Sequence, residues 1–281
     1  MIPAGVGFGV GAAISWGSGD YGGGLASRRA TPLATVVLSQ AIGLPVAAAM
    51  ILLAGERIPG AASLAWAMIG GASGFVTLVC LYRGLATRAM GPVSAIATIV
   101  GVGLPVMAGV LTGDRLRPQD MAGIALALIA IFLVTRPTGN LRIDRNGLAL
   151  ALVAGMGSGG FFIAMGQSAD AAGETWWPLV ASRLASLGLA VLMTVVLRQS
   201  GPTFRSLSPL MAFVGLADML GTVCFLLAQS QGSLSLAAVT SSQYPVVTTL
   251  LAHAFLGQRL ERAHVAGIGL ALLGIALFTV S

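Results

Sequence analysis

The stretch GDRLRPQDMAGIALAL at residues 113–128 returns as GQRLERAHVAGIGLAL at residues 257–272, a shift of 144 positions in a chain of 281. Each copy begins with a short turn that contains a glycine and an arginine, and continues into an apolar run around Ala-Gly-Ile. Self-similarity at a fixed spacing is the mark of an internal duplication. We therefore predict two similar halves, at residues 1–137 and 138–281.

The chain is too apolar for a water-soluble protein. Hydrophobic residues make up 56% of it and charged residues only 9%, and the mean hydropathy is +0.92. Soluble domains carry about 25% charged residues. Most apolar side chains must therefore face lipid or each other. The net charge of +6 comes from arginines in short segments between apolar runs, where they orient helices and meet anionic lipid, so it does not indicate a nucleic-acid partner.

Ten segments are apolar and long enough to cross a bilayer, which takes about 20 residues per helix. They are expected near Ile2–Ala26, Pro32–Ala54, Leu64–Ala86, Pro92–Leu111, Met121–Val134, Leu148–Ala169, Trp177–Leu197, Leu210–Ser230, Leu234–Leu256 and Val265–Val280. With five spans in each half, the second half enters the membrane from the opposite side. The predicted fold class is an all-α membrane protein with ten transmembrane helices, in two inverted five-helix repeats around a central cavity. Many secondary transporters are built in this way.

Three motifs resemble the drug/metabolite transporter superfamily in its ten-helix form with two EamA-type domains. They are the Trp16-Gly-Ser turn of the first span and the two repeated turns, Gly113-Asp-Arg-Leu and Gly257-Gln-Arg-Leu. The family usually has Gly-Glu-x-Leu at these turns, so Asp114 and Gln258 replace the glutamate.

The family also often has an arginine within the second helix of a repeat. Arg183 matches that position in the second half, whereas the first half has Gln40.

The resemblance implies a metabolite exporter or exchanger whose cavity is lined mainly by the first, third, fourth, sixth, eighth and ninth helices. Some ten-helix members of the family export amino acids, including aromatic ones. The predicted function is therefore a secondary transporter of small metabolites, foremost neutral and aromatic amino acids, that works by alternating access in the bacterial inner membrane. Its partners would be a small solute and the lipid bilayer, with proton coupling as an option. A monomer would suffice, and no cofactor or metal is expected.

Charged groups within the apolar spans are few, and each costs roughly 2.5–3.5 kcal/mol at the centre of a bilayer helix. Asp20 on the first span and His253 on the ninth are candidates for coupling through protonation, although both also suit a structural place near a helix end. Arg183 and Asp218 lie on neighbouring spans. Because buried charges are usually paired, they are expected to form a structural ion pair.

Aromatic and hydroxyl side chains on cavity-type helices are the predicted substrate contacts, because rings with a polar tip suit amphipathic ligands. The predicted set is Trp16, Tyr82, Ser158, Ser241, Ser242, Gln243 and Tyr244. An interfacial belt or plain helix packing is the alternative role for these residues. Pro245 removes a backbone hydrogen bond and is expected to break the ninth span near Ser241, and Pro105 is expected to interrupt the fourth span in the same way.

Two other functional classes remain open from the sequence. Residues 17–20 read Gly-Ser-Gly-Asp, as in intramembrane aspartyl proteases, and Asp218 could supply the second carboxylate that this chemistry needs. However, the Tyr-Asp context is absent, and the repeat copy ends in Gly160. A passive facilitator or channel would share the fold and need no coupling group.

The distribution of arginines bears on orientation. If the termini were cytoplasmic, the cytoplasmic loops would hold only Arg57, Arg115 and Arg117, and the opposite loops would hold far more. The positive-inside rule therefore favours termini outside, whereas the family resemblance implies cytoplasmic termini.

Overall fold

The fold is entirely helical in the computed structural model, which describes residues 3–26, 31–85, 90–136, 144–172, 176–199, 208–257 and 259–279. The helices are α1 (Ala4–Ala26), α2 (Pro32–Ala54), α3 (Ala61–Leu85), α4 (Met90–Thr112), α5 (Pro118–Val134), α6 (Arg145–Ala172), α7 (Trp176–Val196), α8 (Pro209–Ser230), α9 (Leu234–Ser241), α10 (Tyr244–Leu256) and α11 (Arg262–Thr279). Because α9 and α10 are two parts of one span, the described helices make ten spans. Six of them are long and apolar enough to cross a membrane by themselves. The predicted fold class is confirmed.

Local capping signals explain where several helices begin and end. Thr31 and Ser208 precede a proline, and their hydroxyls accept the amides of the residues three positions on, at 3.2 and 3.3 Å. A proline in the first turn has no amide to leave unpaired, so it suits this place. Gly55 and Gly257 end α2 and α10 with φ values of 64° and 65°, a left-handed conformation that glycine adopts without a Cβ clash.

The ninth span is broken and the fourth is not. The helix stops after Ser241 and restarts at Tyr244. Pro245 has no amide hydrogen, so it cannot donate the helical hydrogen bond to the carbonyl of Ser241, four residues earlier. In α4, by contrast, the helix continues through Pro105 from Met90 to Thr112. The predicted interruption of the fourth span is therefore wrong, because neighbouring helices hold a proline-containing membrane helix together despite one missing hydrogen bond.

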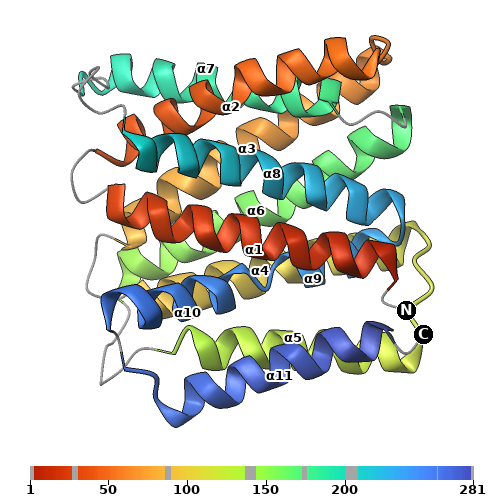
Figure 1. The fold of residues 1–281 in the computed structure, drawn as a ribbon, viewed down its shortest axis with the longest axis vertical. Coiled ribbons are helices and arrows are strands. Elements are labelled where there is room, and N and C mark those ends of the chain that lie inside the picture. The colour runs from red at the N-terminus through yellow and green to blue at the C-terminus, as the bar shows by residue number, and fades with distance from the viewer. Residues whose placement is uncertain are drawn as a thin grey trace.

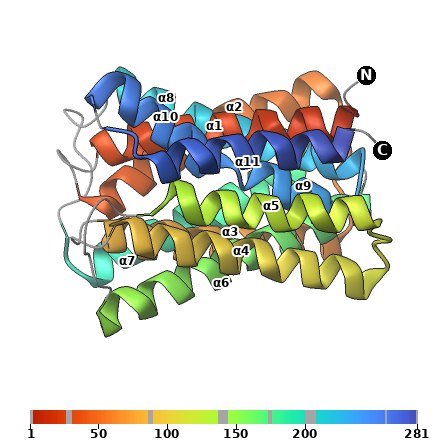
Figure 2. The same ribbon diagram turned by 90° about the horizontal axis from the view of Figure 1, so that it is seen from below.

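The two halves are interleaved in an elongated bundle (Figure 1). Helices α2 and α7 pack together at one edge, and α5 and α11 pack together at the other. Between these pairs, α1 of the first half packs against α8 of the second, and α6 of the second half packs against α3 of the first. Both termini lie at the same end of the bundle (Figure 2). We call this the terminal end. Helix α1 starts there and α6 starts at the opposite end, as inverted repeats require.

Glycines allow the closest crossings between the halves. A Cβ atom on Gly71 of α3 would overlap the backbone carbonyl of Ser182 on α7, and one on Gly221 of α8 would overlap the indole ring of Trp16 on α1. Small residues at such crossings bring membrane helices into direct backbone contact. The position of Trp16 therefore depends on a glycine in the other half.

Polar contacts join the two halves at the terminal end. The Asp114 carboxylate accepts hydrogen bonds from the amide and the hydroxyl of Ser235 on α9, at 3.0 and 2.6 Å. The Glu56 carboxylate accepts the amide of Trp176 on α7 at 2.9 Å, and Ser63 on α3 donates to a carbonyl of α6 at 2.9 Å. Each contact runs from the first half to the second, and two of them place a carboxylate on amides at a helix N-terminus, where negative charge is stabilising.

Candidate functional site

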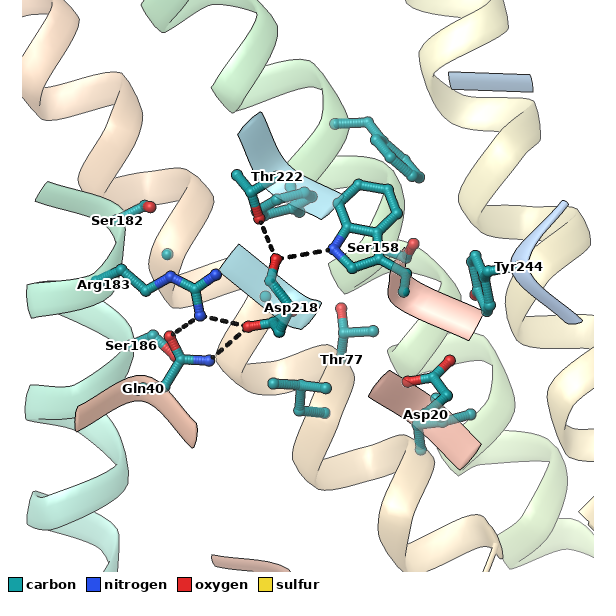
Figure 3. A pocket seen from close by; sticks show the side chains of 17 residues that line it. Asp20, Gln40, Thr77, Ser158, Ser182, Arg183, Ser186, Asp218, Thr222 and Tyr244 are labelled. Atoms are coloured by element: carbon teal, nitrogen blue, oxygen red, sulfur yellow. Dashed lines mark hydrogen bonds and ion pairs between the residues drawn. The ribbon is translucent and has the colours of Figure 1, made fainter. Parts of the chain in front are cut away.

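A cavity of about 110 Å³ lies between the two halves, lined by α1, α2, α3, α6, α7, α8 and α10 (Figure 3). Its lining on α3 runs from Gly71 to Leu81, and on α1 from Trp16 to Asp20. The α1 stretch and most of the α3 stretch lie in the half of the helix that is farther from the terminal end, whereas Ser182 and Arg183 of α7 lie in the nearer half. The cavity therefore lies near the middle of the bundle, away from the polar contacts that tie the two halves together.

The set of helices around the cavity differs in part from the expected one. The first, third, sixth, eighth and ninth spans contribute as expected. Among the described residues the fourth span contributes none, because α4 packs behind α6 and α9. Its place is taken by α2 and α7, which carry Gln40 and Arg183 into the lining.

One wall of the cavity is aromatic. The Trp16 ring packs against Phe161 and Phe162 of α6, with centroid distances of 6.0 and 5.7 Å and edge-to-face geometry. Phe225 of α8 closes the group behind them, 5.0 Å from Phe162. The Trp16 indole N–H donates to the Asp218 backbone carbonyl at 3.2 Å, so its polar edge is satisfied and its orientation fixed. This wall can hold an apolar side chain of a solute.

The opposite side of the cavity holds a charged triad (Figure 3). Arg183 Nη1 contacts the Asp218 carboxylate and donates to Gln40 Oε1 at 2.7 Å, and Gln40 Nε2 donates back to Asp218 Oδ2 at 3.2 Å. The Arg183 side chain is only 4% exposed, whereas that of Asp218 is 27% exposed. Each member thus contacts the other two, which offsets much of the cost of burying two charges.

Asp20 lies across the cavity from this triad, beside Tyr244 (Figure 3). The Tyr244 hydroxyl shares a hydrogen bond with Thr98 of α4 at 3.3 Å. In the part of the chain that the structure describes, the Asp20 carboxylate makes neither an ion pair nor a hydrogen bond. A carboxylate without a protein cation, in a membrane cavity, is a group that a ligand or a proton can neutralise.

The structure separates the predicted substrate contacts into two groups. Trp16, Ser158 and Tyr244 line the cavity, whereas the side chain of Tyr82 lies outside the described part of the structure. The run from Ser241 to Gln243 is buried within the protein and does not line the cavity.

Local hydrogen bonds use part of this polar run. Ser242 Oγ donates to the Ala238 carbonyl at 2.5 Å, and Gln243 Nε2 donates to the Val239 carbonyl at 3.3 Å. These two groups therefore bond to the broken helix instead of facing the cavity, whereas Ser241 Oγ is buried without a hydrogen-bond partner among the described residues.

Of the two predicted coupling residues, only Asp20 lines the cavity. His253 is exposed on the last turn of α10 and is not part of the described lining. Its position near the end of the ninth span places it away from the aromatic wall and from the triad.

Several lining residues were not singled out from the sequence, among them Thr77, Phe161, Ser182, Ser186 and Thr222. A signal existed for α7, where two serines flank an arginine at helical spacing in an otherwise apolar span. Such a polar stripe on one face marks the side of a membrane helix that faces protein or a cavity.

Comparison with known proteins agrees with the fold and the duplication. The model of the EamA-like transporter family matches twice, at residues 3–136 and at residues 145–280. The chain belongs to the EamA-like transporter family. It is therefore a multi-pass membrane transporter rather than an enzyme, and its two EamA domains are the two duplicated halves.

Individual relatives of this EamA-like transporter are similar along nearly their whole length. An uncharacterized transporter, YwfM of Bacillus subtilis (strain 168), is 30% identical over 282 residues, which cover 95% of this chain and 91% of that protein. One solved structure, described only as the crystal structure of a protein, has a TM-score of 0.78 at 19% identity and covers 100% of this chain and 98% of its own. The similarity to this solved structure shows the fold alone.

The arrangement of the two aspartates also disagrees with protease chemistry. An aspartyl dyad needs two carboxylates that share a proton. In the EamA-like transporter the Asp218 carboxylate contacts Arg183 and Gln40, and Asp20 lies on the other side of the cavity.

Proposed function

We propose that this EamA-like transporter is a secondary exporter of neutral and aromatic amino acids in the bacterial inner membrane, and that it works by alternating access. The observation that carries the proposal is the cavity between the inverted halves, which places an aromatic wall next to Asp20, a carboxylate that has no cation partner among the described residues.

The cavity offers complementary surfaces to each part of such a solute. Asp20 attracts an ammonium group, and the nearby faces of Tyr244 and Trp16 attract it further through cation–π interaction. The rings of Trp16 and Phe161 offer apolar surface to a side chain. Binding sites for small molecules commonly combine a mainly apolar lining with a few convergent polar groups.

The inverted repeat supports alternating access. Polar contacts such as Asp114–Ser235 tie the halves together at the terminal end, and the cavity lies between the halves near the middle of the bundle. In inverted-repeat transporters the two halves exchange conformations, so that a site held near the midplane opens to each side in turn. In this proposal, the conformation with the terminal end tied together is one of these two states.

Coupling to protons would run through Asp20. A carboxylate can be neutralised either by a proton or by an ammonium group, but not by both at once. Export of an amino acid in exchange for a proton therefore needs no further titratable group in the cavity.

The test is counterflow in proteoliposomes with a panel of labelled neutral and aromatic amino acids, with and without a pH gradient. We expect saturable counterflow that is lost in Trp16→Ala and kept in Trp66→Ala, because Trp66 is 39% exposed on the outer surface of α3. A pH gradient should accelerate flux in the wild type and not in Asp20→Asn.

Three outcomes would contradict the proposal. Absence of flux across the panel would remove amino acids as substrates. Flux without counterflow would identify a channel instead of a carrier. Equal loss in both tryptophan variants would show that the cavity is not the binding site.

A further inference from the structure

We infer that Arg183 and Ser186 on α7 form a subsite for the carboxylate group of the solute, and that Asp20 on the opposite side binds its ammonium group. The inference rests on the proposed function and deepens it, because it assigns the class of solute as a zwitterion with a fixed orientation. Asp20 and the α7 group lie on opposite sides of one cavity (Figure 3).

Ser186 lines the cavity and has a buried hydroxyl group that its own protein does not use. Its side chain is buried, at 4% relative exposure, and its Oγ has no hydrogen-bond partner among the described residues. Buried hydroxyls without a partner are rare in native proteins, and each needs an explanation. Among the described residues that line the cavity, Ser186 is the one with a buried side-chain atom in this condition.

Other hydroxyls in the lining are already used by their own helices. Ser182 donates to the Leu179 carbonyl at 2.8 Å, Thr222 to the Asp218 carbonyl at 3.1 Å, and Thr77 to a carbonyl of α3 at 3.0 Å. Ser186 is therefore the hydroxyl that is left for a ligand on this side of the cavity.

Arg183 keeps donors for a second carboxylate. A guanidinium group has five N–H donors, and the contacts to Gln40 and Asp218 both use Nη1. Gln40 also donates to Asp218 and so holds that carboxylate on one edge of the guanidinium group. The Nε and Nη2 donors make no hydrogen bond in the described structure. A planar guanidinium group with free donors is the side chain best suited to carboxylate recognition.

The charges of the cavity select for a zwitterion. A simple carboxylic acid would satisfy Arg183 and Ser186 but would be repelled by Asp20 and Asp218. A simple amine would satisfy Asp20 but would leave Ser186 without a partner. A solute with both groups satisfies both sides, and its apolar side chain can then lie against Trp16 and the phenylalanines of α6.

The experiment measures binding to the purified full-length protein with three matched probes: L-phenylalanine, phenethylamine, which lacks the carboxylate, and 3-phenylpropanoate, which lacks the ammonium group. The variants are Ser186→Ala, its control Thr194→Ala on the same helix, and Asp20→Asn. Thr194 is buried like Ser186, but it is not part of the described lining and its hydroxyl donates to the Ala190 carbonyl at 2.7 Å.

We expect the wild type to prefer L-phenylalanine to both analogues. Ser186→Ala should weaken L-phenylalanine and 3-phenylpropanoate by about tenfold, the size of one hydrogen bond to a charged group, and leave phenethylamine unchanged. Asp20→Asn should weaken L-phenylalanine and phenethylamine and not 3-phenylpropanoate. Thr194→Ala should change none of the three. Because Ser186→Ala removes an unpaired hydroxyl, the variant should fold as well as the wild type.

The outcomes that overturn the subsite differ from those that overturn the proposed function. Equal weakening of all three probes by Ser186→Ala, or no weakening of any, would overturn the subsite. Equal affinity of the wild type for phenethylamine and L-phenylalanine would also overturn the subsite, but it would leave a transporter of amines. Binding of none of the three would overturn both.

Discussion

The triad of Arg183, Asp218 and Gln40 allows a quantitative prediction about stability. Neutralising Asp218 to Asn leaves the Arg183 guanidinium group with only neutral acceptors, although its side chain is 4% exposed. Removing one member of a buried ion pair costs about 3–5 kcal/mol, because an uncompensated charge stays buried. We therefore expect Asp218→Asn to lower the free energy of unfolding by about 4 kcal/mol.

Neutralising the other partner of the ion pair should lower the free energy of unfolding by less. Arg183→Gln leaves the Asp218 carboxylate, whose side chain is 27% exposed to the cavity and still accepts from Gln40. Water in the cavity can hydrate this carboxylate, so the expected cost falls to about 2–3 kcal/mol, which is below the range for a fully buried pair.

The double variant Arg183→Gln with Asp218→Asn removes both charges and leaves three amides that can bond to one another. Its cost should be about 2–3 kcal/mol, far less than the sum of the two single variants. The coupling energy should then be about 3–5 kcal/mol, which is at or above the upper end for residues in direct contact.

Reversible unfolding in mixed detergent micelles, followed by far-ultraviolet circular dichroism, measures all three variants against the wild type. Two results would refute the reasoning. One is additivity of the single variants within about 0.5 kcal/mol, the limit for independent sites. The other is a greater loss in Arg183→Gln than in Asp218→Asn, because it would mean that exposure does not set the cost.

Three further predictions concern the packing of the two halves. Gly71→Ala should destabilise the protein by about 3 kcal/mol, since the added methyl group meets backbone of α7, and Gly7→Ala, which adds a methyl group in open space, should leave the unfolding midpoint unchanged or raise it. Asp114→Ala should lower the free energy of unfolding by about 1–2 kcal/mol in the same assay, because the variant loses the carboxylate that accepts hydrogen bonds from Ser235 in the first turn of α9. A change near zero would show that this carboxylate does not stabilise the start of α9. Glu56→Ala should speed amide hydrogen exchange in the first turn of α7 and leave that of α8 unchanged, because its carboxylate accepts amides only at α7 among the described residues.

The spans could be predicted closely because hydrophobic length and turn chemistry are local. The apolar runs of α2 and α10 end at Gly55 and Gly257, and prolines and capping hydroxyls mark the starts of other helices. All ten described spans begin and end within three residues of the expected bounds. The broken ninth span followed from Pro245, but the same reasoning failed at Pro105, where the packing of neighbouring helices decides whether a proline interrupts a helix.

The site was harder to predict because it depends on which face of each helix turns inward. Ser241 and Ser242 are polar and lie at the middle of a span, which favoured a substrate contact, yet their helix faces protein at that point. Ser186 carried little signal as a lone serine. It becomes notable only when the structure shows that the Ser182 hydroxyl is used and the Ser186 hydroxyl is not.

Gln40 and Arg183 occupy corresponding positions of the two repeats, and in the folded protein they touch each other across the boundary between the halves. In a symmetric pair of identical five-helix chains, this boundary would bring each residue against its own copy, and two arginines there would repel. A single fused chain can place glutamine on one side and arginine on the other, with Asp218 shared between them. Because the two halves are fused in one chain, the centre of the protein can be asymmetric, which a dimer of identical subunits could not achieve. Two copies of either half alone would not reproduce this arrangement.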